Sequence, residues 1–171
     1  MSNCSRIFLI GPMGAGKTTV GKRVAKALKR RFVDCDRELE RRTGATIALI
    51  FDIEGEPGFR QREKRLIDEL SLVDDVVLAT GGGAVLDADN RNALRRRGFT
   101  VYLYAPLSDL LMRTRNDTNR PLLNTEDRAT RLQQIVAERE PLYQQSSHLS
   151  IDTGAHTLFE IVALICEAVQ A

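Results

Sequence analysis

The chain has 171 residues, of which 43% are hydrophobic and 28% charged, and its formal net charge is +2. These values suit one water-soluble domain, 1–171, and a net charge this small provides no general attraction for nucleic acid. No apolar run approaches the ~20 residues of a membrane-spanning helix, and the N-terminal segment lacks the apolar core of a signal peptide. We therefore expect a cytoplasmic monomer that begins at Met1 and has no nucleic-acid or membrane partner.

The cysteines are too few and too far apart for a structural role in cross-linking. Cys4, Cys35 and Cys166 form no Cys-x-x-Cys pair, and their number is odd. Neither a disulfide framework nor a zinc site is supported, and two histidines make a histidine-built metal site equally unexpected.

Short apolar strands alternate with helical patterns along the chain. The expected strands are 6–10, 31–35, 75–79, 99–104 and 149–152. The expected helices are 17–30, 36–72 (broken near Gly44 and at 55–58), 87–97, 106–114, 126–145 and 157–169. We expect Gly98 to form the C-terminal cap of helix 87–97, and Pro141 to interrupt or kink helix 126–145.

This alternation predicts an α/β fold with a five-stranded parallel sheet, right-handed crossovers and helices on both faces. In such sheets ligands bind beyond the carboxyl ends of the strands. Three groups of chemically notable residues fall at such ends: the segment after Ile10, residues 34–36 and residues 81–83.

Residues 11–18, Gly-Pro-Met-Gly-Ala-Gly-Lys-Thr, fit the phosphate-loop pattern G-x-x-x-x-G-K-[ST] between an expected strand and an expected helix. Glycines let successive N–H groups point at phosphate oxygens, and the helix adds the positive end of its dipole. Lys17 is expected to reach the β- and γ-phosphates of a nucleotide and Thr18 to bind Mg²⁺. The alternative is a chance glycine-rich turn, which the flanking strand and helix make rarer. The residues expected to bind ATP here are Gly14, Ala15, Gly16, Lys17, Thr18 and Thr19.

Two carboxylates, Asp34 and Asp36, flank Cys35 at the end of the second strand. Because side chains alternate along a strand, both carboxylates are expected to point to the same side. Mg²⁺ beside Thr18 would offset their repulsion, and a phosphoryl acceptor needs a carboxylate to receive or orient its hydroxyl proton. The alternative is that Asp36 merely caps the following helix.

The third strand ends in Thr80 and three glycines, Gly81 to Gly83, with no aspartate where many phosphate-loop enzymes carry one. Glycines leave backbone N–H groups uncovered, so a substrate can come close. A tight turn without a ligand is the alternative. Six of the twelve glycines lie in this cluster and the phosphate loop, which favours two ligand-facing turns.

Four arginines stand out by their neighbours. Arg60 and Arg139 suit the bidentate binding of a carboxylate, although an intrahelical ion pair between Glu56 and Arg60 is an equally simple explanation. The polar segment 113–125 has the composition of a mobile lid, from which Arg120 could stabilise transferring phosphate and Arg113 could stack on a base. Plain surface charge is the alternative for both.

Taken together, these motifs resemble the shikimate kinase family from about Arg6 to Asp152. The matching segments are GPMGAGKTTVGK at 11–22, FVDCD at 32–36, IFDIEGEPGFRQRE at 50–63, TGGGAV at 80–85, RPLL at 120–123 and REPLY at 139–143. Each motif is moderately specific, whereas their order and spacing together are very specific. Departures are small: Thr18 replaces the serine of some members, and the segment 152–156 carries no basic residue or proline to assign to adenine contacts. The missing third-strand aspartate is itself a family feature.

The resemblance implies a three-layer phosphate-loop kinase of the nucleoside-monophosphate-kinase-like type, with a substrate-binding segment at about 34–63 and a lid at about 113–125. It implies transfer from ATP, with Mg²⁺, to the 3-hydroxyl of shikimate, a step in chorismate and aromatic amino-acid biosynthesis. The resemblance also implies residue roles on the substrate side: Asp36 holds substrate hydroxyls and acts as base, Arg60 and Arg139 clamp the substrate carboxylate, and Gly82 contacts substrate by its backbone. On the nucleotide side it implies that Asp34 lies near Mg²⁺ through water, that Arg120 touches the phosphates and that Arg113 touches the adenine.

Two alternatives remain open at this point. One is a similar kinase that acts on gluconate or a nucleoside monophosphate, against which the aspartate pair and the glycine triplet argue. The other is a nucleotide-binding module without catalysis, against which the intact set Lys17, Thr18, Asp34, Asp36 and Arg120 argues.

Overall fold

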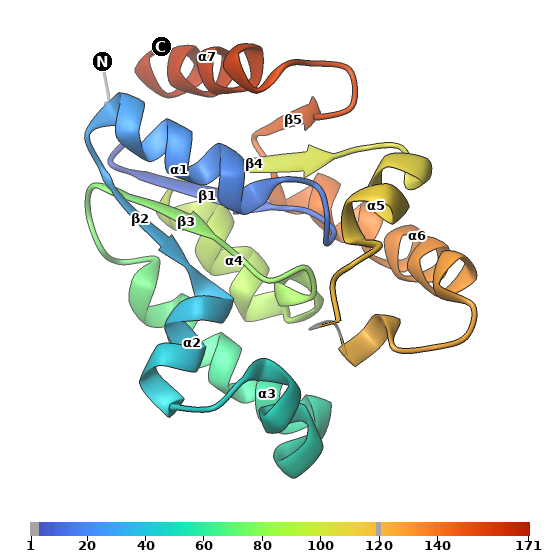
Figure 1. Ribbon diagram of the computed structural model, residues 1–171. Coiled ribbons are helices and arrows are strands. Elements are labelled where there is room, and N and C mark those ends of the chain that lie inside the picture. Colours follow the sequence, from blue (N-terminus) through green and yellow to red (C-terminus); the bar gives the residue numbers. More distant parts are fainter. Residues whose placement is uncertain (1–3, 119–120) are drawn as a thin grey trace.

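The computed structural model describes residues 4–118 and 121–171 of the chain, and its centre is one five-stranded parallel sheet (Figure 1). The strands are β1 (Arg6–Ile10), β2 (Arg31–Asp34), β3 (Val76–Ala79), β4 (Phe99–Tyr104) and β5 (Leu149–Asp152). They lie in the order β2-β3-β1-β4-β5, and every neighbouring pair is parallel. The predicted α/β class and parallel sheet are therefore confirmed.

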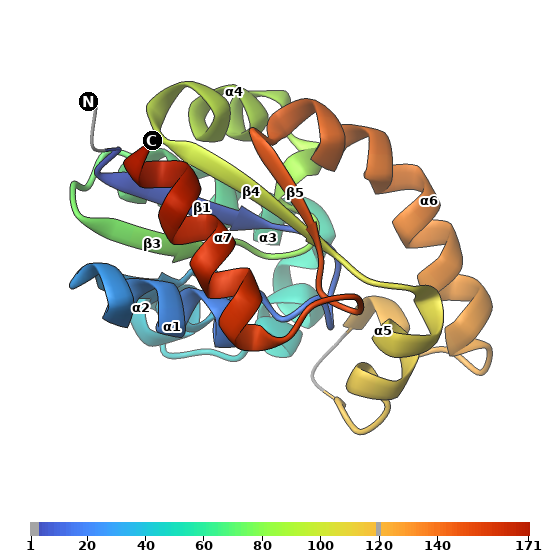
Figure 2. The same cartoon turned by 90° about the horizontal axis from the view of Figure 1, so that it is seen from above.

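Helices cover both faces of the sheet. They are α1 (Lys17–Leu28), α2 (Cys35–Thr43), α3 (Ile47–Leu70), α4 (Ala88–Arg97), α5 (Leu107–Thr114), α6 (Arg128–Ser146) and α7 (Leu158–Gln170), with 3₁₀ turns η1 (Ala84–Leu86) and η2 (Pro121–Leu123). Figure 2 shows α1 and α7 on one face and α4 on the other. Within the described ranges no helix is both long and apolar enough to cross a membrane.

The central strand β1 explains why two layers of helices are needed. Ile7 and Leu9 belong to the core that α1 and α7 cover, whereas Phe8 and Ile10 belong to the core that α3 and α4 cover. All four side chains are fully buried. An uninterrupted apolar strand of this kind is stable only where both faces of the sheet are covered.

Of two predicted helix breaks, the one at 55–58 is confirmed, whereas the interruption at Pro141 is wrong. Helix α3 does change direction, because Gly55 takes a left-handed φ of +69° within it. Helix α6, by contrast, runs as one helix from Arg128 to Ser146 through Pro141, so the predicted interruption is wrong. Buried side chains on both sides of the proline, including Ile135 and Tyr143, hold the two halves on one surface and offset the lost hydrogen bond.

Gly98 follows the last residue of α4 as predicted, but it does not form a left-handed cap. Its φ of −166° and ψ of −173° are extended values that any residue adopts. Space is the constraint instead, because a Cβ atom on Gly98 would lie 2.6 Å from Phe8 Cε2 and 2.7 Å from the Arg6 carbonyl oxygen. Glycine is required here so that α4 can turn closely over β1 into β4.

Replacing Gly98 by alanine should therefore destabilise the protein by about 1–3 kcal/mol, the usual effect of forcing a group into a packed core. Denaturant unfolding of the variant measures this loss. Arg96→Ala, an exposed change in the last turn of the same helix, should stay within about 0.5 kcal/mol of wild type. A Gly98→Ala variant as stable as wild type would show that Phe8 and Arg6 move aside without penalty.

Candidate active site

The phosphate loop connects β1 to α1 and curls through three glycines with left-handed backbone angles. Gly11, Gly14 and Gly16 have φ values of +146°, +82° and +97°. Gly11 also lies so close to the Leu103 carbonyl that a Cβ atom would overlap it. Helix α1 starts at Lys17 with no side-chain cap, so its first N–H groups point out of the helix end as they do in anion-binding loops.

Lys17 folds back over this loop. Its Nζ donates hydrogen bonds to the carbonyl oxygens of Gly11, at 2.6 Å, and Pro12, at 2.9 Å. The ammonium group is therefore held at the mouth of the loop, where phosphate oxygens would meet it. Of the other predicted phosphate-binding residues, Ala15 is buried, Gly14, Gly16 and Thr18 are half-buried, and Thr19 is exposed in the first turn of α1.

Asp34 joins the phosphate loop to the next strand and helix. Its Oδ2 accepts a hydrogen bond of 2.6 Å from the Thr18 hydroxyl. Its Oδ1 accepts from the backbone N–H groups of Asp36 and Arg37, at 3.1 and 3.2 Å, and so caps α2. The alternative in which Asp36 caps this helix is therefore wrong, because Asp34 is the cap.

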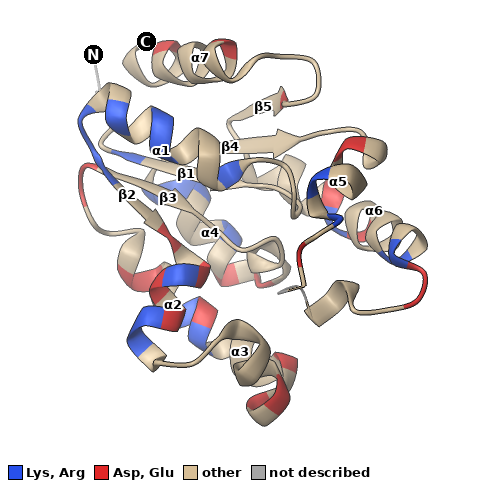
Figure 3. Cartoon of the chain, in the orientation of Figure 1, with Lys and Arg blue, Asp and Glu red and all other residues tan. Residues whose placement is uncertain are grey.

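Asp36 lies in the first turn of α2, and the strand alternation expected for Asp34 and Asp36 is wrong. The cap at Asp34 ends β2 and starts the helix at Cys35, so strand alternation does not apply to the pair. The helical turn aims Asp36 at the glycines after β3: a Cβ atom on Gly81 would lie 3.0 Å from Asp36 Oδ1. Figure 3 shows the acidic segment where β2 passes into α2.

The oxygen atoms of Thr18 and Asp34 form a donor set that suits Mg²⁺. This ion prefers hard oxygen ligands and usually takes only one or two from the protein, with the rest from phosphates and water. Among residues 4–118 and 121–171, no group of three or more His, Cys, Asp or Glu side chains could hold a metal ion by itself. The pair therefore fits an ion that arrives together with nucleotide phosphates.

A cavity of about 640 Å³ opens beside this pair. It brings together residues from α1, β2, α2, α3, α6 and the turn after β3. The predicted residues that line it are Thr18, Asp34, Asp36, Arg60, Gly82 and Arg139. Part of the predicted lid, including Asp117 and Leu122, lines it as well.

The two arginines of this cavity are held in different ways. Arg60 forms ion pairs with Glu63, at 2.8 Å, and Glu56, at 3.1 Å, so the intrahelical pair expected from the sequence is present at the cavity wall. Its guanidinium group covers Gly83 so closely that a Cβ atom there would overlap it. Arg139 is only 4% exposed, and its Nε has no hydrogen-bond partner among the described residues.

Tyr143 holds the turn of Gly81, Gly82 and Gly83 after β3, here called the glycine turn. The phenol hydroxyl donates a hydrogen bond to the Gly82 carbonyl, and the ring stacks on Tyr102 with centroids 5.0 Å apart. Burial raises the pKa of Tyr143 to about 12, so the phenol stays a donor at physiological pH. Tyr143 therefore holds the backbone of Gly82 in place where this residue lines the cavity.

Arg113 lies apart from this cavity, between the phosphate loop and the segment after β5. Its Nη1 donates to the Gly14 carbonyl, at 3.1 Å, and to the Thr153 hydroxyl, at 3.0 Å. Thr153 in turn donates to the Ala15 carbonyl at 3.0 Å. Arg120, the predicted phosphate contact from the lid, lies outside the described residues.

Comparison with known proteins decides the family. A family model for shikimate kinase matches residues 13–170. The chain belongs to the shikimate kinase family. The shikimate kinase of Halorhodospira halophila is 53% identical over 166 residues, which covers 97% of this chain and 94% of that protein. The shikimate kinase of Methylococcus capsulatus is 48% identical over 170 residues, or 99% of this chain and 95% of that protein.

Solved structures agree with this family assignment. Shikimate kinase from Acinetobacter baumannii, in complex with shikimate, superposes with a TM-score of 0.94 at 46% identity and covers 98% of this chain and 93% of that one. A gluconokinase from Sinorhizobium meliloti, at 19% identity and a TM-score of 0.54, shares the fold alone.

The shikimate kinase cavity also contains Glu63, to which sequence reasoning assigned no role. It is 2% exposed, its Oε2 has no hydrogen-bond partner in the described part of the chain, and this oxygen lies 2.8 Å from where a Cβ on Gly81 would be. Burial raises the pKa of Glu63 to about 7, against the opposing effect of Arg60. Its place on the apolar side of α3, between Phe59 and Leu66, was the available sign that this carboxylate is buried.

Glu63→Gln should change how stability depends on pH. Folding raises the pKa of Glu63 from 4.5 to about 7, so between these values the folded chain binds more protons than the unfolded chain. The contribution of this group to the free energy of unfolding therefore falls as the pH rises through that window. Relative to Glu63→Gln, wild type should lose up to about 3 kcal/mol between pH 4.5 and 7 in denaturant unfolding without ligands.

Glu167→Gln is the matched control, because this side chain is exposed on α7. Its pH profile should follow that of wild type. Parallel profiles for wild type and Glu63→Gln would mean that the Glu63 carboxylate does not carry the burial penalty inferred from its position.

Proposed function

We propose that this chain transfers the γ-phosphoryl group of ATP to the 3-hydroxyl of shikimate, a carboxylated cyclic polyol, in aromatic amino-acid biosynthesis. One observation carries the proposal. A single cavity next to the phosphate loop holds a carboxylate for hydroxyl groups, Asp36, and two arginines for a carboxylate, Arg60 and Arg139. Family membership and the likeness to a shikimate-bound kinase support the same acceptor.

The donor side follows from the phosphate loop. The N–H groups from Gly14 to Thr19 would bind the phosphates of ATP, with the Lys17 ammonium between the β- and γ-phosphates. Thr18 would hold Mg²⁺ directly, and Asp34 through water. When bound, Mg²⁺ neutralises charge on the phosphate oxygens. Arg113 would lie against the adenine, and Arg120 would reach the transferring group.

On the acceptor side, positioning does most of the chemistry. Arg60 and Arg139 would bind the shikimate carboxylate bidentately, and the Gly82 N–H would contact the ring hydroxyls. Asp36 would orient the attacking 3-hydroxyl and accept its proton as the bond to phosphorus forms. Because phosphoryl transfer needs little covalent assistance, fixed geometry and charge stabilisation account for the rate.

Two segments would close over the reactants. Residues 34–63 form one wall of the cavity and carry the acceptor contacts, and residues 113–125 act as the lid. Asp117 and Leu122 already line the cavity, which supports this role. Closure would exclude water and so prevent hydrolysis of ATP. We propose that residues 1–171 function as one unit, a cytoplasmic monomer.

The direct test is ADP release from MgATP by purified protein with shikimate, gluconate or AMP as separate acceptors. Strong stimulation by shikimate alone is the expected result. Stimulation by gluconate or AMP in its place would assign a different acceptor, and ATP binding without turnover on any of the three would contradict a kinase acting on them.

Asp36→Asn tests the base. The amide keeps the shape of the side chain but cannot accept the proton, so kcat should fall by about 10²–10⁴-fold. Steady-state kinetics with shikimate measures this, and Asp52→Asn, an exposed change on α3, should leave kcat unchanged. Full turnover by Asp36→Asn would remove Asp36 from the role of base.

A further inference from the structure

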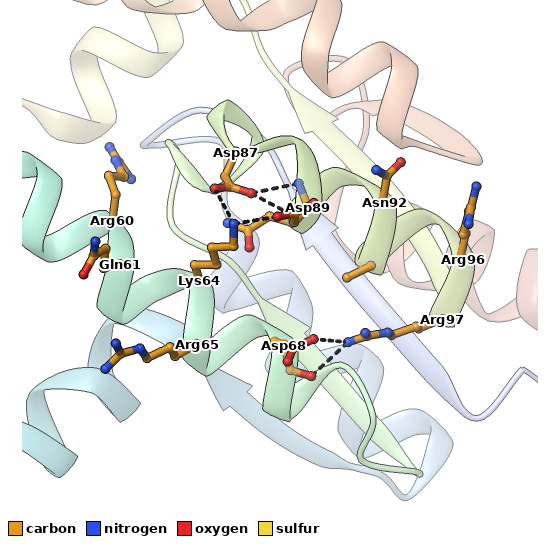
Figure 4. A pocket seen from close by; sticks show the side chains of 12 residues that line it. Arg60, Gln61, Lys64, Arg65, Asp68, Asp87, Asp89, Asn92, Arg96 and Arg97 are labelled. Carbon is orange, nitrogen blue, oxygen red and sulfur yellow. Dashed lines mark hydrogen bonds and ion pairs between the residues drawn. The ribbon is translucent and has the colours of Figure 1, made fainter.

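Helices α3 and α4 are joined by two sets of ion pairs across a polar groove of about 860 Å³ (Figure 4). Near one end, Lys64 Nζ contacts Asp87 Oδ2 at 3.2 Å and Asp89 Oδ2 at 2.6 Å. One turn further along α3, Asp68 Oδ1 contacts Arg97 Nη1 at 2.8 Å. The two sets connect the same helices, but only the first lies near the acceptor cavity.

Asp87 and Asp89, the partners of Lys64 at the start of α4, are connected to the glycine turn by hydrogen bonds. Asp87 caps α4 with Oδ1, which accepts from the N–H groups of Asp89, at 2.8 Å, and Asn90, at 3.2 Å, while Oδ2 faces Lys64. The buried Asn90 amide donates to the Ala84 carbonyl at 3.0 Å. Ala84 directly follows Gly83, so a displacement of the start of α4 would be passed on to the turn that lines the cavity.

The α3 side connects to Arg60, which together with Arg139 forms the proposed carboxylate clamp. Lys64 lies one helical turn after Arg60 and next to Glu63, the ion-pair partner of Arg60. The Arg60 guanidinium in turn lies directly against Gly83. Lys64 therefore closes a ring of contacts that runs from Arg60 along α3, across to the cap of α4 and back through η1 to Gly83.

We propose that Lys64 is a positioning residue that acts through Arg60: by joining α3 to Asp87 and Asp89, it sets the distance between the Arg60 guanidinium and the glycine turn. The inference rests on the proposed function, because the clamp matters only for an acceptor that carries a carboxylate. It is specific to one end of the groove, since Asp68, the partner of Arg97, lies about two turns beyond Arg60 on α3.

Exposure separates this role from a general structural one. Lys64 is 41% exposed and Asp89 is 74% exposed, so the ion pairs are well solvated and contribute little to global stability. Loss of Lys64 should therefore be visible in substrate binding much more than in unfolding. A small displacement of a positioning group is enough to weaken binding strongly.

The experiment compares Lys64→Met, Lys64→Arg and Asp89→Asn with the control Asp68→Asn, which disrupts the pair at the other end of the groove. Lys64→Met should raise KM for shikimate about fivefold and the Kd for shikimate in calorimetry to match, with KM for ATP within about twofold and Tm close to wild type. Lys64→Arg should restore most of the affinity. Asp89→Asn should shift the shikimate KM in the same direction, and Asp68→Asn should leave it unchanged.

The outcomes separate the positioning role of Lys64 from the proposed function. Suppose that wild type turns over shikimate but that the KM for shikimate is unchanged in Lys64→Met and Asp89→Asn. This result would overturn the positioning role and leave the proposed function intact. If Lys64→Met raised the KM values of shikimate and ATP equally, or if Asp68→Asn raised the shikimate KM as much as Lys64→Met does, Lys64 would contribute only to general stability. Either result would also overturn the positioning role. Wild type that does not phosphorylate shikimate would overturn the proposed function and this inference with it. If Lys64→Met fails to fold, Asp89→Asn decides the question, because its side chain is mostly exposed.

Discussion

The geometry of the site depends on one carboxylate, that of Asp34. One oxygen bonds the Thr18 hydroxyl and so fixes the start of α1, while the other caps α2 and so fixes the direction in which Asp36 points. The Asp34 carboxylate accepts hydrogen bonds from the Thr18 hydroxyl and from the positive end of the α2 dipole, and both favour its negative charge. The donor and acceptor halves of the site are therefore joined through a single side chain.

The parallel sheet places these groups level with one another. In the strand register Asp34 pairs with Ala79, and Ala79 pairs with Leu9, one residue before the end of β1. The three chain segments that leave these strands are the start of α2, the glycine turn and the phosphate loop. Because neighbouring parallel strands end at one edge, segments up to about 70 residues apart in sequence meet without any specific long-range pairing motif.

The sequence was sufficient for features that depend on local chemistry. The apolar runs of β4 and β5 predicted the strands with the bounds that the structure has, and the phosphate loop followed from its spacing. The errors arose where two local tendencies compete or where contacts are distant. Strand alternation was applied to Asp34 and Asp36 because nothing in the sequence says which aspartate caps α2. Glu63 was passed over because the close approach of its carboxylate to Gly81 joins residues 18 positions apart.

The wall of the cavity beside the phosphate loop contains polar atoms whose hydrogen-bonding capacity is unused. Arg139 Nε and Glu63 Oε2 are both buried without a partner in the described residues, whereas Arg60 already has two acidic partners. Unsatisfied buried groups are unfavourable, so the folded chain carries this cost in the wall of the cavity. Local exceptions of this kind are typical of functional sites, and here both belong to residues that line the cavity beside the phosphate loop.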